Sequence, residues 1–495
     1  MDLFIQGFKV FFNIPNFIWM NIGLLLGVIF GAIPGLTVIL CIVLFLPLTY
    51  TMGPIESFMF LLGIYCAGGY GGSISAILIK TPGTPHAAAT MIDGYPMSQR
   101  GQGRKALNIA LHASTFGGFF SAFALLFFAP QFAKFAQKMG TPEYFLVCLF
   151  GLTIIAGVSG KSLVKGIISG ALGLFISSVG LDPVTGQPRY IFGNINLYSG
   201  FDIVICLIGI FALSEILARG KREEILKADA KILKQDKGKI SKAEYKLMAL
   251  PSLISAAIGV IIGIIPGTGA TMASFFSYNN AKNMSKTPEK FGDGAIEGIA
   301  AAETANNAVT GATLIPLLTM GIPGDGCVAI MLGALMVHNL TPGPNLFVEH
   351  GVTMYAIMIG LLFVNLFMFL QGRYLTGVFA KVINIPLAIL TPIIVMFCFA
   401  GAFSVNTSTI DIFISLCFAL LAYVLIKVDF PTIPILLGLV LGDITEENFR
   451  RSLVLSDGSS KIFASSPICL AFIALIALTL VIVIYGKIRD FKKDN

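Results

Sequence analysis

The sequence is poor in the residues that form soluble surfaces and that carry out most enzyme chemistry. Only 12% of its 495 residues are charged, and it has four histidines and one tryptophan. A soluble globular domain carries about 25% charged residues, whereas this chain is 56% hydrophobic with a mean hydropathy of +0.86. The composition predicts an all-α, polytopic membrane protein, because an α-helix satisfies its own backbone hydrogen bonds in lipid.

Common motifs of catalysis and metal binding are also absent. The sequence has no CxxC, no HExxH, no GxSxG and no G-x-x-x-x-G-K-[ST] phosphate loop. Its eight cysteines stand mostly in apolar stretches, which favours buried small side chains over metal ligands or disulfides. We therefore expect no enzyme and no cofactor. The net charge of +7 is modest and predicts basic loops beside a lipid bilayer, with no nucleic-acid partner.

In place of such motifs the sequence has Pro-Gly pairs inside apolar runs. In the stretch 259–343, two Pro-Gly pairs stand in apolar surroundings, Pro266-Gly267 and Pro323-Gly324. Proline and glycine interrupt backbone hydrogen bonding, which lipid tolerates only where protein or a water-filled cavity satisfies the freed groups. Broken hydrophobic segments in corresponding positions of two halves indicate the binding site of a transporter.

An earlier part of the chain repeats this plan. Residues 27–35 match residues 259–267 at seven of nine positions, and Pro82-Gly83 stands in the order of the second pair. The repeat offset is 232 residues at the first pair and 241 at the second. We therefore predict roughly 10–14 membrane segments in two homologous halves, with discontinuous or re-entrant helices at the breaks. The halves are either parallel or inverted repeats, and inverted repeats are the commoner arrangement for paired broken helices.

One long polar stretch divides the two halves. Residues 219–246 carry ten Lys or Arg against five Asp or Glu, which is typical of a cytoplasmic linker. The first half is expected over 1–218, and the second half with the C-terminal helices over 247–495. The basic tail predicts a cytoplasmic C-terminus; it contains Lys487, Arg489, Lys492 and Lys493.

Three local features leave alternatives open. Four glycines among residues 68–72 would make a poor helix, so an unwound stretch is as good an interpretation as close helix packing. Residues 93–96, Asp-Gly-Tyr-Pro, have the composition of a turn. His86 stands just after a break and could titrate, although a surface position is the simpler interpretation.

Several motifs, in order along nearly the whole chain, resemble one known family. They are the Pro-Gly pairs with their glycine-rich surroundings, the run 93–96, Phe291-Gly292-Asp293-Gly294, Glu303–Ala308, Gly343-Pro344, 437–442 and Glu446 to Arg451. The set is similar to the large membrane subunit of tripartite tricarboxylate transporters, the TctA family. The resemblance implies a bacterial inner-membrane permease that works with a small four-helix membrane subunit (TctB-like) and a periplasmic solute-binding protein (TctC-like). It also implies carboxylate uptake driven by a gradient of Na⁺ or H⁺.

A carboxylate substrate must be held by donors without being trapped. Full-charge partners are costly to bury and slow to release, whereas helix N-termini offer free N–H groups and partial positive charge. The alternative is that the Pro-Gly pairs are only hinges or packing kinks. We predict that substrate binds at the half-helix ends just after the breaks, at Gly35, Thr37, Ser73, Ser75, Gly83, Gly267, Thr268, Thr271, Asn306 and Gly324.

Two acids in apolar surroundings, Glu303 and Asp325, are predicted to couple transport to a cation, because an intramembrane acid marks an ion or proton path by default. Asn307 joins them, and the side-chain carbonyls of Asn306 and Asn307 form a candidate Na⁺ site. The alternatives are a helix cap for Asp325, an ion pair for Glu303 and interhelical hydrogen bonds for the two amides.

The sequence therefore predicts a secondary active, cation-coupled permease for a di- or tricarboxylate or a related organic acid. An uncoupled organic-anion channel or facilitator is the alternative, since paired breaks fit both. A membrane-embedded enzyme would need a nucleophile with its base or a metal constellation, and four scattered histidines form neither.

Overall fold

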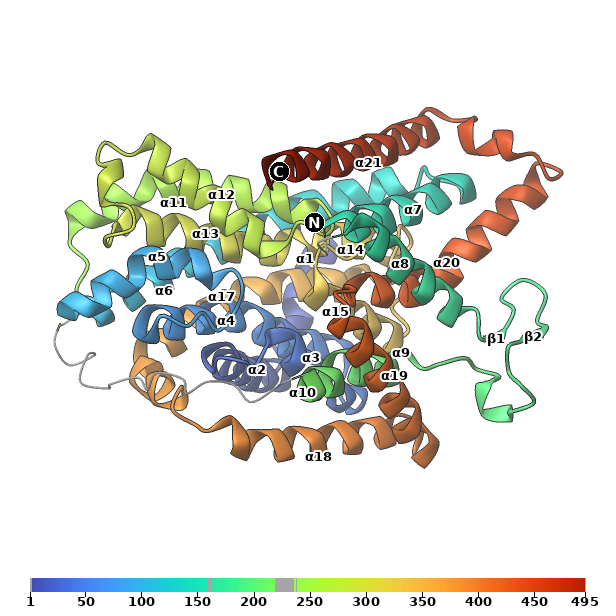
Figure 1. Ribbon diagram of the computed structural model, residues 1–495, viewed down its shortest axis with the longest axis horizontal. Helices are drawn as coiled ribbons and strands as arrows, with labels where there is room; N and C mark the ends of the chain where they lie inside the picture. The colour runs from blue at the N-terminus through green and yellow to red at the C-terminus, as the bar shows by residue number, and fades with distance from the viewer. Residues whose placement is uncertain (1, 159–161, 219–235, 237, 495) are drawn as a thin grey trace.

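The computed structural model describes residues 2–158, 162–218, 236 and 238–494. Figure 1 shows a body of α-helices, from which one antiparallel hairpin projects at the right, made of β1 (Gly180–Leu181) and β2 (Pro188–Arg189). The predicted all-α fold with long apolar helices is confirmed. Most of the predicted linker, 219–235 and 237, lies outside the described residues.

The first part of the chain contains two breaks between helices. The first break separates α2 (Ile14–Ala32) from α3 (Val38–Phe45), and the second separates α4 (Pro54–Ile79) from α5 (Ala87–Met97). The other helices of this part are α1 (Asp2–Phe11), α6 (Gly103–Ala136), α7 (Thr141–Val158), α8 (Leu163–Ser177), α9 (Ile203–Leu207) and α10 (Ser214–Ala218).

The later part has the same order of breaks. The first lies between α11 (Lys242–Ile264) and α12 (Gly269–Met284), and the second between α14 (Leu314–Met320) and α15 (Gly326–Val337). The remaining helices are α13 (Ile296–Ala312), α16 (Leu346–Glu349), α17 (Gly351–Val382), α18 (Leu387–Asn406), α19 (Thr409–Lys427), α20 (Ile433–Leu455) and α21 (Pro467–Asp494).

Helix α11 begins five residues before the predicted domain boundary at 247. A capping box explains this start, because Ser241 and Glu244 satisfy each other's backbone N–H groups at the first turn. From the sequence alone, these polar residues are predicted to belong to the linker. The division of the chain into 1–218, 219–246 and 247–495 otherwise stays a prediction.

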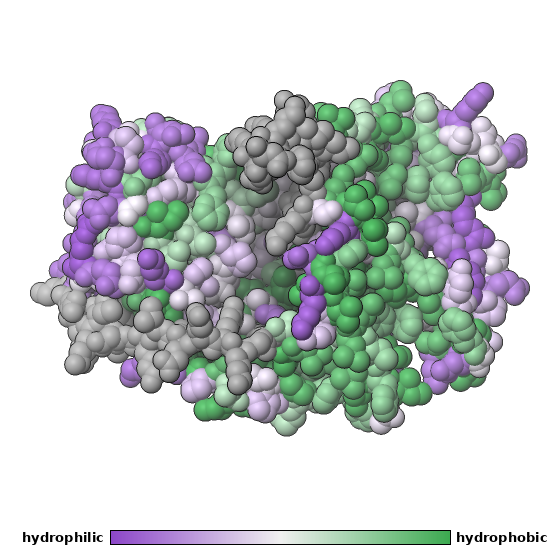
Figure 2. Space-filling model, in the orientation of Figure 1, coloured by the Kyte–Doolittle hydropathy of each residue, from purple (hydrophilic) through white to green (hydrophobic). Residues whose placement is uncertain are grey.

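Seven helices in the described part of the chain are long and apolar enough to cross a membrane, and six shorter apolar helices accompany them. Figure 2 shows hydrophilic residues gathered at the two ends of the long axis, with apolar surface between them. One end carries the starts of α6 and α11, and the other carries the hairpin and the end of α20 (Figure 1). This distribution is typical of a multi-pass membrane protein whose two polar ends face water.

Two helices, α4 and α13, are shielded from the surroundings along nearly their whole length. Every residue from Ser57 to Ile79 of α4 and from Glu297 to Ala312 of α13 is buried. Each packs against the helix that precedes the first break of its part, α2 with α4 and α11 with α13. The buried pairs therefore bring both breaks of each part close to one another.

Glycines make the contact between α2 and α4 possible. A Cβ on Gly27 would lie 2.4 Å from the carbonyl oxygen of Ile64, and one on Gly31 would lie 2.3 Å from that of Gly68. Small residues at such positions let helix backbones approach closely in membranes. The glycines of 68–72 consequently sit inside a continuous helix, and the interpretation of this stretch as unwound is wrong.

The predicted turn at 93–96 is also wrong, since these residues continue α5. Asp93 is fully buried, and its Oδ1 accepts hydrogen bonds from the backbone N–H groups of Gly292, Gly294 and Ala295 at 2.8–2.9 Å. The carboxylate thereby supplies the hydrogen-bond acceptor for the backbone N–H groups of the loop that leads into α13. A long-range partner, which the local composition does not reveal, favours helix over turn here.

Candidate functional site

The first breaks of the two parts have the same backbone geometry. Ile33 and Ile265, the residues before each proline, are extended, with φ/ψ of −86°/112° and −82°/115°. A residue before proline is restricted to this region. Gly35 and Gly267 follow with φ of 96° and 80°, which glycine adopts without strain.

The second breaks also correspond to each other. Lys80 ends α4 and Gly321 ends α14, both in the left-handed conformation, with φ of 56° and 76°. A Cβ on Gly83 would lie 1.9 Å from the carbonyl oxygen of Gly31, and a Cβ on Gly324 would lie 3.0 Å from that of Gly263. Gly31 and Gly263 are equivalent at the 232-residue offset. In each part the second break therefore lies against the helix that carries the first.

The two breaks of the later part are directly bonded. The N–H of Gly267 donates to the carbonyl oxygen of Gly324 at 2.8 Å. Thr268 donates its hydroxyl to the carbonyl oxygens of Ile262 and Ile265, at 2.6 and 2.8 Å. Backbone groups freed by Pro266 are thus satisfied within the protein, which gives Thr268 a structural contact at the end of α11.

Two half-helices after breaks are capped by their own chain. Thr37 accepts from the N–H of Leu40 at 3.0 Å at the start of α3, and Asp325 accepts from that of Val328 at 2.9 Å at the start of α15. The second oxygen of Asp325 accepts from the hydroxyl of Tyr65 on α4. The capping alternative for Asp325 is what the geometry shows, and its carboxylate makes the N-terminus of α15 a poor place for a second carboxylate.

The start of α5 has no side-chain cap in the described structure. Its first N–H groups, at 87–89, donate instead to the backbone carbonyl oxygens of 84–86. Asn306 of α13 lies beside it, only 2% exposed, and its Nδ2 has no hydrogen-bond partner among the described residues. A Cβ on Gly69 would lie 3.6 Å from both amide atoms of Asn306 and 3.7 Å from Nε2 of His86. We call Gly69, Thr84, His86 and Asn306 the Asn306 cluster; Nε2 of His86 lies 2.9 Å from Oγ1 of Thr84.

Helix α12 also begins without a side-chain cap in the described structure, and it flanks the same segment of α13. Ala273 of α12 packs with Ala305 and Val309 of α13, one residue before and three residues after Asn306. Thr271 stands in the first turn of α12 and is half-buried. The polar face of α13 is therefore bordered by two uncapped helix starts.

Glu303 lies one turn before Asn306 and is fully buried. Its Oε1 accepts hydrogen bonds from the hydroxyls of Ser73 and Thr90, and its Oε2 accepts one from Ser114 at 2.7 Å. These hydroxyls come from α4, α5 and α6. We call Glu303 and the three hydroxyl residues the Glu303 cluster.

The sequence interpretation found part of this arrangement. Ser73, which is predicted to bind substrate, donates a hydrogen bond to Glu303. Thr90 and Ser114 are not among the predicted site residues. Ser75 is buried and donates to the carbonyl oxygen of Gly72 at 3.3 Å. Asn307 donates from Nδ2 to the carbonyl oxygen of Glu303 at 3.2 Å, and its Oδ1 has no partner among the described residues.

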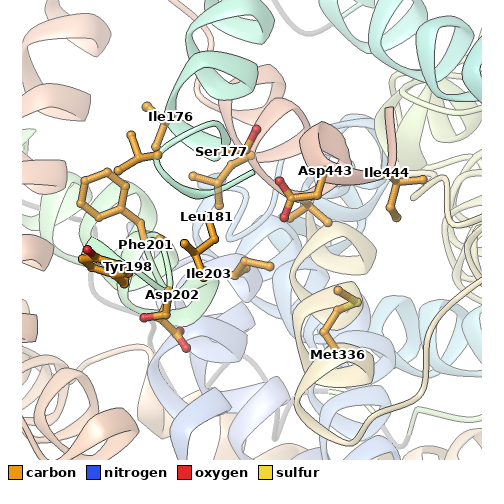
Figure 3. Close-up of a pocket in the computed structure, with 15 residues that line it drawn as sticks. Ile176, Ser177, Leu181, Tyr198, Phe201, Asp202, Ile203, Met336, Asp443 and Ile444 are labelled. Carbon is orange, nitrogen blue, oxygen red and sulfur yellow. The ribbon is translucent and has the colours of Figure 1, made fainter. Parts of the chain in front are cut away.

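A cavity of 390 Å³ lies apart from these clusters, between α8, α9, α20 and the hairpin (Figure 3). None of the predicted site residues lines it. Two carboxyl groups, Asp202 and Asp443, point toward it, and Asp202 also caps α9 by accepting from Val204 N–H at 2.7 Å. Their charge disfavours a carboxylate ligand in this cavity.

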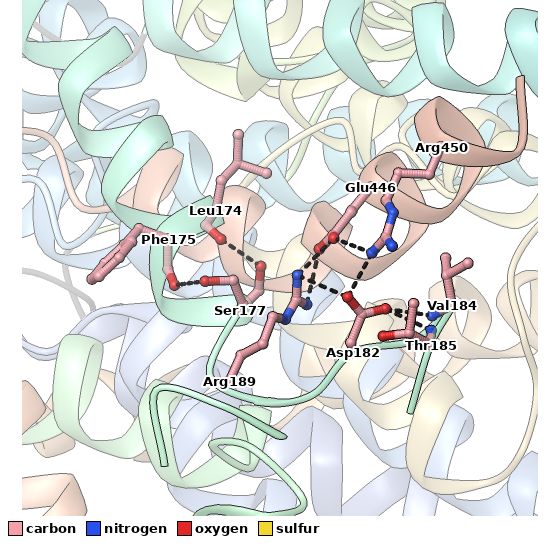
Figure 4. Close-up of polar contacts among 10 residues, drawn as sticks. Leu174, Phe175, Ser177, Asp182, Val184, Thr185, Arg189, Glu446 and Arg450 are labelled. Atoms are coloured by element: carbon pink, nitrogen blue, oxygen red, sulfur yellow. Dashed lines mark hydrogen bonds and ion pairs between the residues drawn. The ribbon is translucent and has the colours of Figure 1, made fainter. Parts of the chain in front are cut away.

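An ion network beside the cavity fastens the hairpin to α20 (Figure 4). Arg189 makes two parallel hydrogen bonds to Glu446, at 2.7 and 3.0 Å. Arg450 donates to Asp182 at 2.6 Å and to Glu446 at 3.0 Å. Backbone N–H of Thr185, then the Arg450 guanidinium, hold the pKa of Asp182 well below its usual range, and Arg189 lowers the pKa of Glu446.

This network predicts an acid-sensitive hairpin. Because both pKa values are depressed in the folded protein, the stabilisation is fully present above the unfolded values of about 4 and is lost as pH falls through the folded values. The protection factors of the amides in the 180–202 loop, which correct for the intrinsic pH dependence of hydrogen exchange, should be unchanged between pH 8 and about pH 5 and should fall below about pH 4. Arg189→Gln should give the low protection already at pH 7.

Arg451→Gln is the matched control. Arg451 pairs with Glu447 at 2.6 Å on an exposed face of the same helix, and such i,i+4 pairs contribute only about 0.3–0.5 kcal/mol. We expect the protection of the 180–202 loop in Arg451→Gln to equal that in wild type. Equal exchange in wild type and Arg189→Gln at pH 7 would contradict a role of the network in fastening the hairpin.

Comparison with known proteins places this architecture in a family. The profile described as "Tripartite tricarboxylate transporter TctA family" matches residues 17–437. An uncharacterised 52.8 kDa protein from the TAR-I ttuC' 3' region of Agrobacterium vitis is 35% identical over 489 residues, which cover 99% of this chain and 97% of the relative. A second uncharacterised protein of that organism, from the TAR-II ttuC' 3' region, is 37% identical over 237 residues, 48% of this chain and 98% of the relative. No solved structure matches significantly. The chain belongs to the TctA family of tripartite tricarboxylate transporters.

Proposed function

We propose that this chain is the permease subunit of a binding-protein-dependent tripartite transporter in the bacterial inner membrane. It takes up a di- or tricarboxylate, or a related organic acid, by secondary active transport coupled to a cation, Na⁺ or H⁺. Its partners are a small four-helix membrane subunit and a periplasmic solute-binding protein. The family membership supports a transporter component that is not an enzyme.

The observation that carries the proposal is the unpartnered, buried Nδ2 of Asn306 beside the uncapped start of α5. A buried N–H without an acceptor is costly, and a substrate carboxylate supplies an acceptor. The helix start adds partial positive charge, and His86 adds a ring nitrogen. No full positive charge is needed, so the anion is held without being trapped.

The remaining substrate contacts in the proposal follow from the breaks. Gly83 and Gly267 bring the starts of α5 and α12 to the polar face of α13, and Thr271 lies on the α12 side. The other predicted residues precede two different helices: Gly35 and Thr37 precede α3, and Gly324 precedes α15. The N-termini of these helices are already capped, by Thr37 and Asp325. We therefore propose that the carboxylate group binds at the α5 and α12 side and that the rest of the substrate extends toward α3 and α15.

Reciprocal contacts support a two-fold relation between the halves. Helix α3, after the first break of the first part, contacts α15, after the second break of the second part. Helix α12, after the first break of the second part, contacts α5, after the second break of the first. Reciprocal contacts of this kind arise from a two-fold axis. We therefore propose that the two parts are inverted repeats, and that the site between them opens alternately to the two sides of the membrane.

The basic loops suggest the orientation of the protein. Lys105, which pairs with Glu244 at 2.5 Å, lies at the polar end that holds the start of α11. The last residues of the predicted linker, 242–246, form the start of α11 at the same end. By the positive-inside rule this end is cytoplasmic in our proposal, the hairpin end is periplasmic, and the C-terminus is cytoplasmic.

Uptake into proteoliposomes tests the proposed function. The vesicles contain this chain, its small membrane partner and its binding protein, and they receive a panel of radiolabelled carboxylates under imposed Na⁺ or H⁺ gradients. Accumulation above the external concentration is the expected result. Equilibration without accumulation would favour an uncoupled facilitator, and no entry of any carboxylate would contradict the proposed substrate class.

Asn306→Asp should weaken uptake strongly in this assay. The substitution keeps the size of the side chain but replaces an N–H donor with a carboxylate oxygen that repels the substrate. Hydrogen bonds to charged groups contribute about 1.5–3 kcal/mol, so we expect the KM for the carboxylate to rise roughly 10–100-fold. Asn448→Asp, the same change at a half-buried position of α20, should leave KM unchanged. An unchanged KM in Asn306→Asp would remove Asn306 from the site.

A further inference from the structure

We propose that a Na⁺ ion binds within the Glu303 cluster, coordinated by the carboxylate of Glu303 and by the hydroxyl oxygens of Ser73, Thr90 and Ser114. We further propose that this ion is the coupling ion, a step that rests on the proposed function. The first part of the inference concerns ion binding alone and does not depend on any substrate.

Among the described residues, no positively charged side chain compensates an ionised Glu303. The residue is fully buried, and within the part of the chain that the structure describes no salt bridge involves it. Three hydroxyl groups donate to its carboxylate, and hydrogen bonds of this kind favour the ionised form. They orient the charge but do not neutralise it, and a buried charge is costly without a cation. The cluster is therefore an anionic site that calls for one positive charge.

The ligand atoms favour a small alkali cation. Each hydroxyl can donate its hydrogen to the carboxylate and still offer oxygen lone pairs, and hard cations prefer carboxylate and neutral oxygen ligands. A single carboxylate balances one charge, which matches Na⁺ better than a divalent ion. A proton could also neutralise Glu303, because a hydroxyl accepts as well as donates a hydrogen bond; the Na⁺ binding experiment below separates the two.

The position of the cluster explains how such an ion would act on substrate. Glu303 precedes Asn306 by three residues on α13, and Thr90 follows His86 by four residues along the start of α5. With a rise of 1.5 Å per residue, the cation and anion sites are about 4.5–6 Å apart along both helices. Opposite charges at this separation in a buried setting attract strongly. Na⁺ should therefore raise the affinity for the carboxylate, and the carboxylate should raise that for Na⁺ by the same factor.

Ion binding is measured on the purified full chain in detergent, without substrate. ²²Na⁺ binding and thermal unfolding are followed as NaCl replaces choline chloride at constant ionic strength. Wild type should bind Na⁺ and be stabilised by it, and Glu303→Gln should lose both responses. Thr90→Val should bind at least about 10-fold more weakly, since one ligand is lost, while Thr90→Ser, which retains the hydroxyl, should bind like wild type.

Thr319→Val serves as the matched control. Thr319 is a fully buried threonine of α14 whose hydroxyl donates to the carbonyl oxygen of Ile315 at 2.7 Å, outside the cluster. Its Na⁺ affinity should equal that of wild type. Equal Na⁺ affinity in wild type and Glu303→Gln would overturn the assignment of the ion to this cluster.

The uptake assay separates failure of this inference from failure of the proposed function. Carboxylate accumulation driven only by an H⁺ gradient, with no Na⁺ binding to the chain, would overturn the ion site and leave the transport function standing. Na⁺ binding that is lost in Glu303→Gln, together with no entry of any carboxylate, would overturn the coupling step and the proposed function but uphold the ion site.

Discussion

Alanine in place of Gly83 should reduce carboxylate uptake roughly 100-fold while the protein still inserts into the membrane. The new Cβ would lie 1.9 Å from the carbonyl oxygen of Gly31 and 2.9 Å from Oγ of Ser75. The φ of Gly83 is not in the left-handed region, so the effect comes from the contact and not from backbone strain. The break and α2 must separate by about 1 Å before this contact becomes tolerable. A shift of this size at a binding site costs roughly 100-fold in activity.

Gly324→Ala should have a smaller effect in the same direction. Its Cβ would lie 2.7 Å from Cβ of Thr313 and 3.0 Å from the carbonyl oxygen of Gly263, and we expect about a 10-fold loss of uptake by the same argument. Gly324→Leu, with a larger side chain, should abolish it. Uptake rates are compared at equal amounts of folded protein, as measured by size-exclusion chromatography in detergent.

Gly333→Ala is the control on α15. Its Cβ would meet Cγ2 of Ile203 at 3.5 Å, an ordinary contact, and uptake should stay within twofold of wild type. Normal uptake by Gly83→Ala would show that the second break can move away from α2 without consequence. The Pro82-Gly83 pair would then be only a connection between helices.

The positions of the breaks could be predicted from the sequence because their cause is local. Proline removes an N–H and forces an extended residue before it, and glycine permits the positive φ found at Gly35 and Gly267. The sequence did not show which half-helix N-termini lack a side-chain cap and so remain available to a ligand. The hydroxyl of Thr37 and the carboxylate of Asp325 occupy two of them, and Asn306 faces a third from another helix.

One open alternative, the unwound stretch at 68–72, and one prediction, the turn at 93–96, failed for the same physical reason. Glycine costs about 1 kcal/mol per residue in an isolated helix, which favours an unwound stretch at 68–72. In the folded chain close packing of α2 on α4 outweighs this cost, and the same glycines are what permit the approach. The turn predicted at 93–96 fails likewise, because Asp93 finds its partners about 200 residues later in the chain.

The hydroxyl ligands of Glu303 carry no sequence signal of their own. Ser73, Thr90 and Ser114 are single polar residues on otherwise small or apolar helices, and such residues commonly bond to their own helix backbone. Only the convergence of α4, α5 and α6 on α13 distinguishes them. The acid itself was recognisable, because a carboxyl group among small uncharged neighbours needs partners that its own helix does not supply.

Alanine at Gly27 and at its repeat counterpart Gly259 should destabilise the protein, whereas alanine at Gly377 should not. All three positions lie inside helices, where alanine is favoured over glycine by about 1 kcal/mol. At Gly377 of α17 nothing lies within 4 Å of the added Cβ, so stability should be unchanged or higher. At Gly27 and Gly259 the Cβ would lie 2.4 and 2.6 Å from the carbonyl oxygens of Ile64 and Ala305, and overpacking of this kind costs about 1–3 kcal/mol or more.

The opposite signs make this experiment a test of the duplicated packing itself. Thermal unfolding in detergent should show lower midpoints for Gly27→Ala and Gly259→Ala, by similar amounts, because equivalent glycines face equivalent carbonyl groups at the 241-residue offset. A lower unfolding midpoint for Gly27→Ala but not for Gly259→Ala would mean that only α2 and α4 depend on close approach. A higher unfolding midpoint for both variants would contradict the close packing of α4 on α2 and of α13 on α11. It would also contradict the proposal that this packing holds the two breaks of each part together.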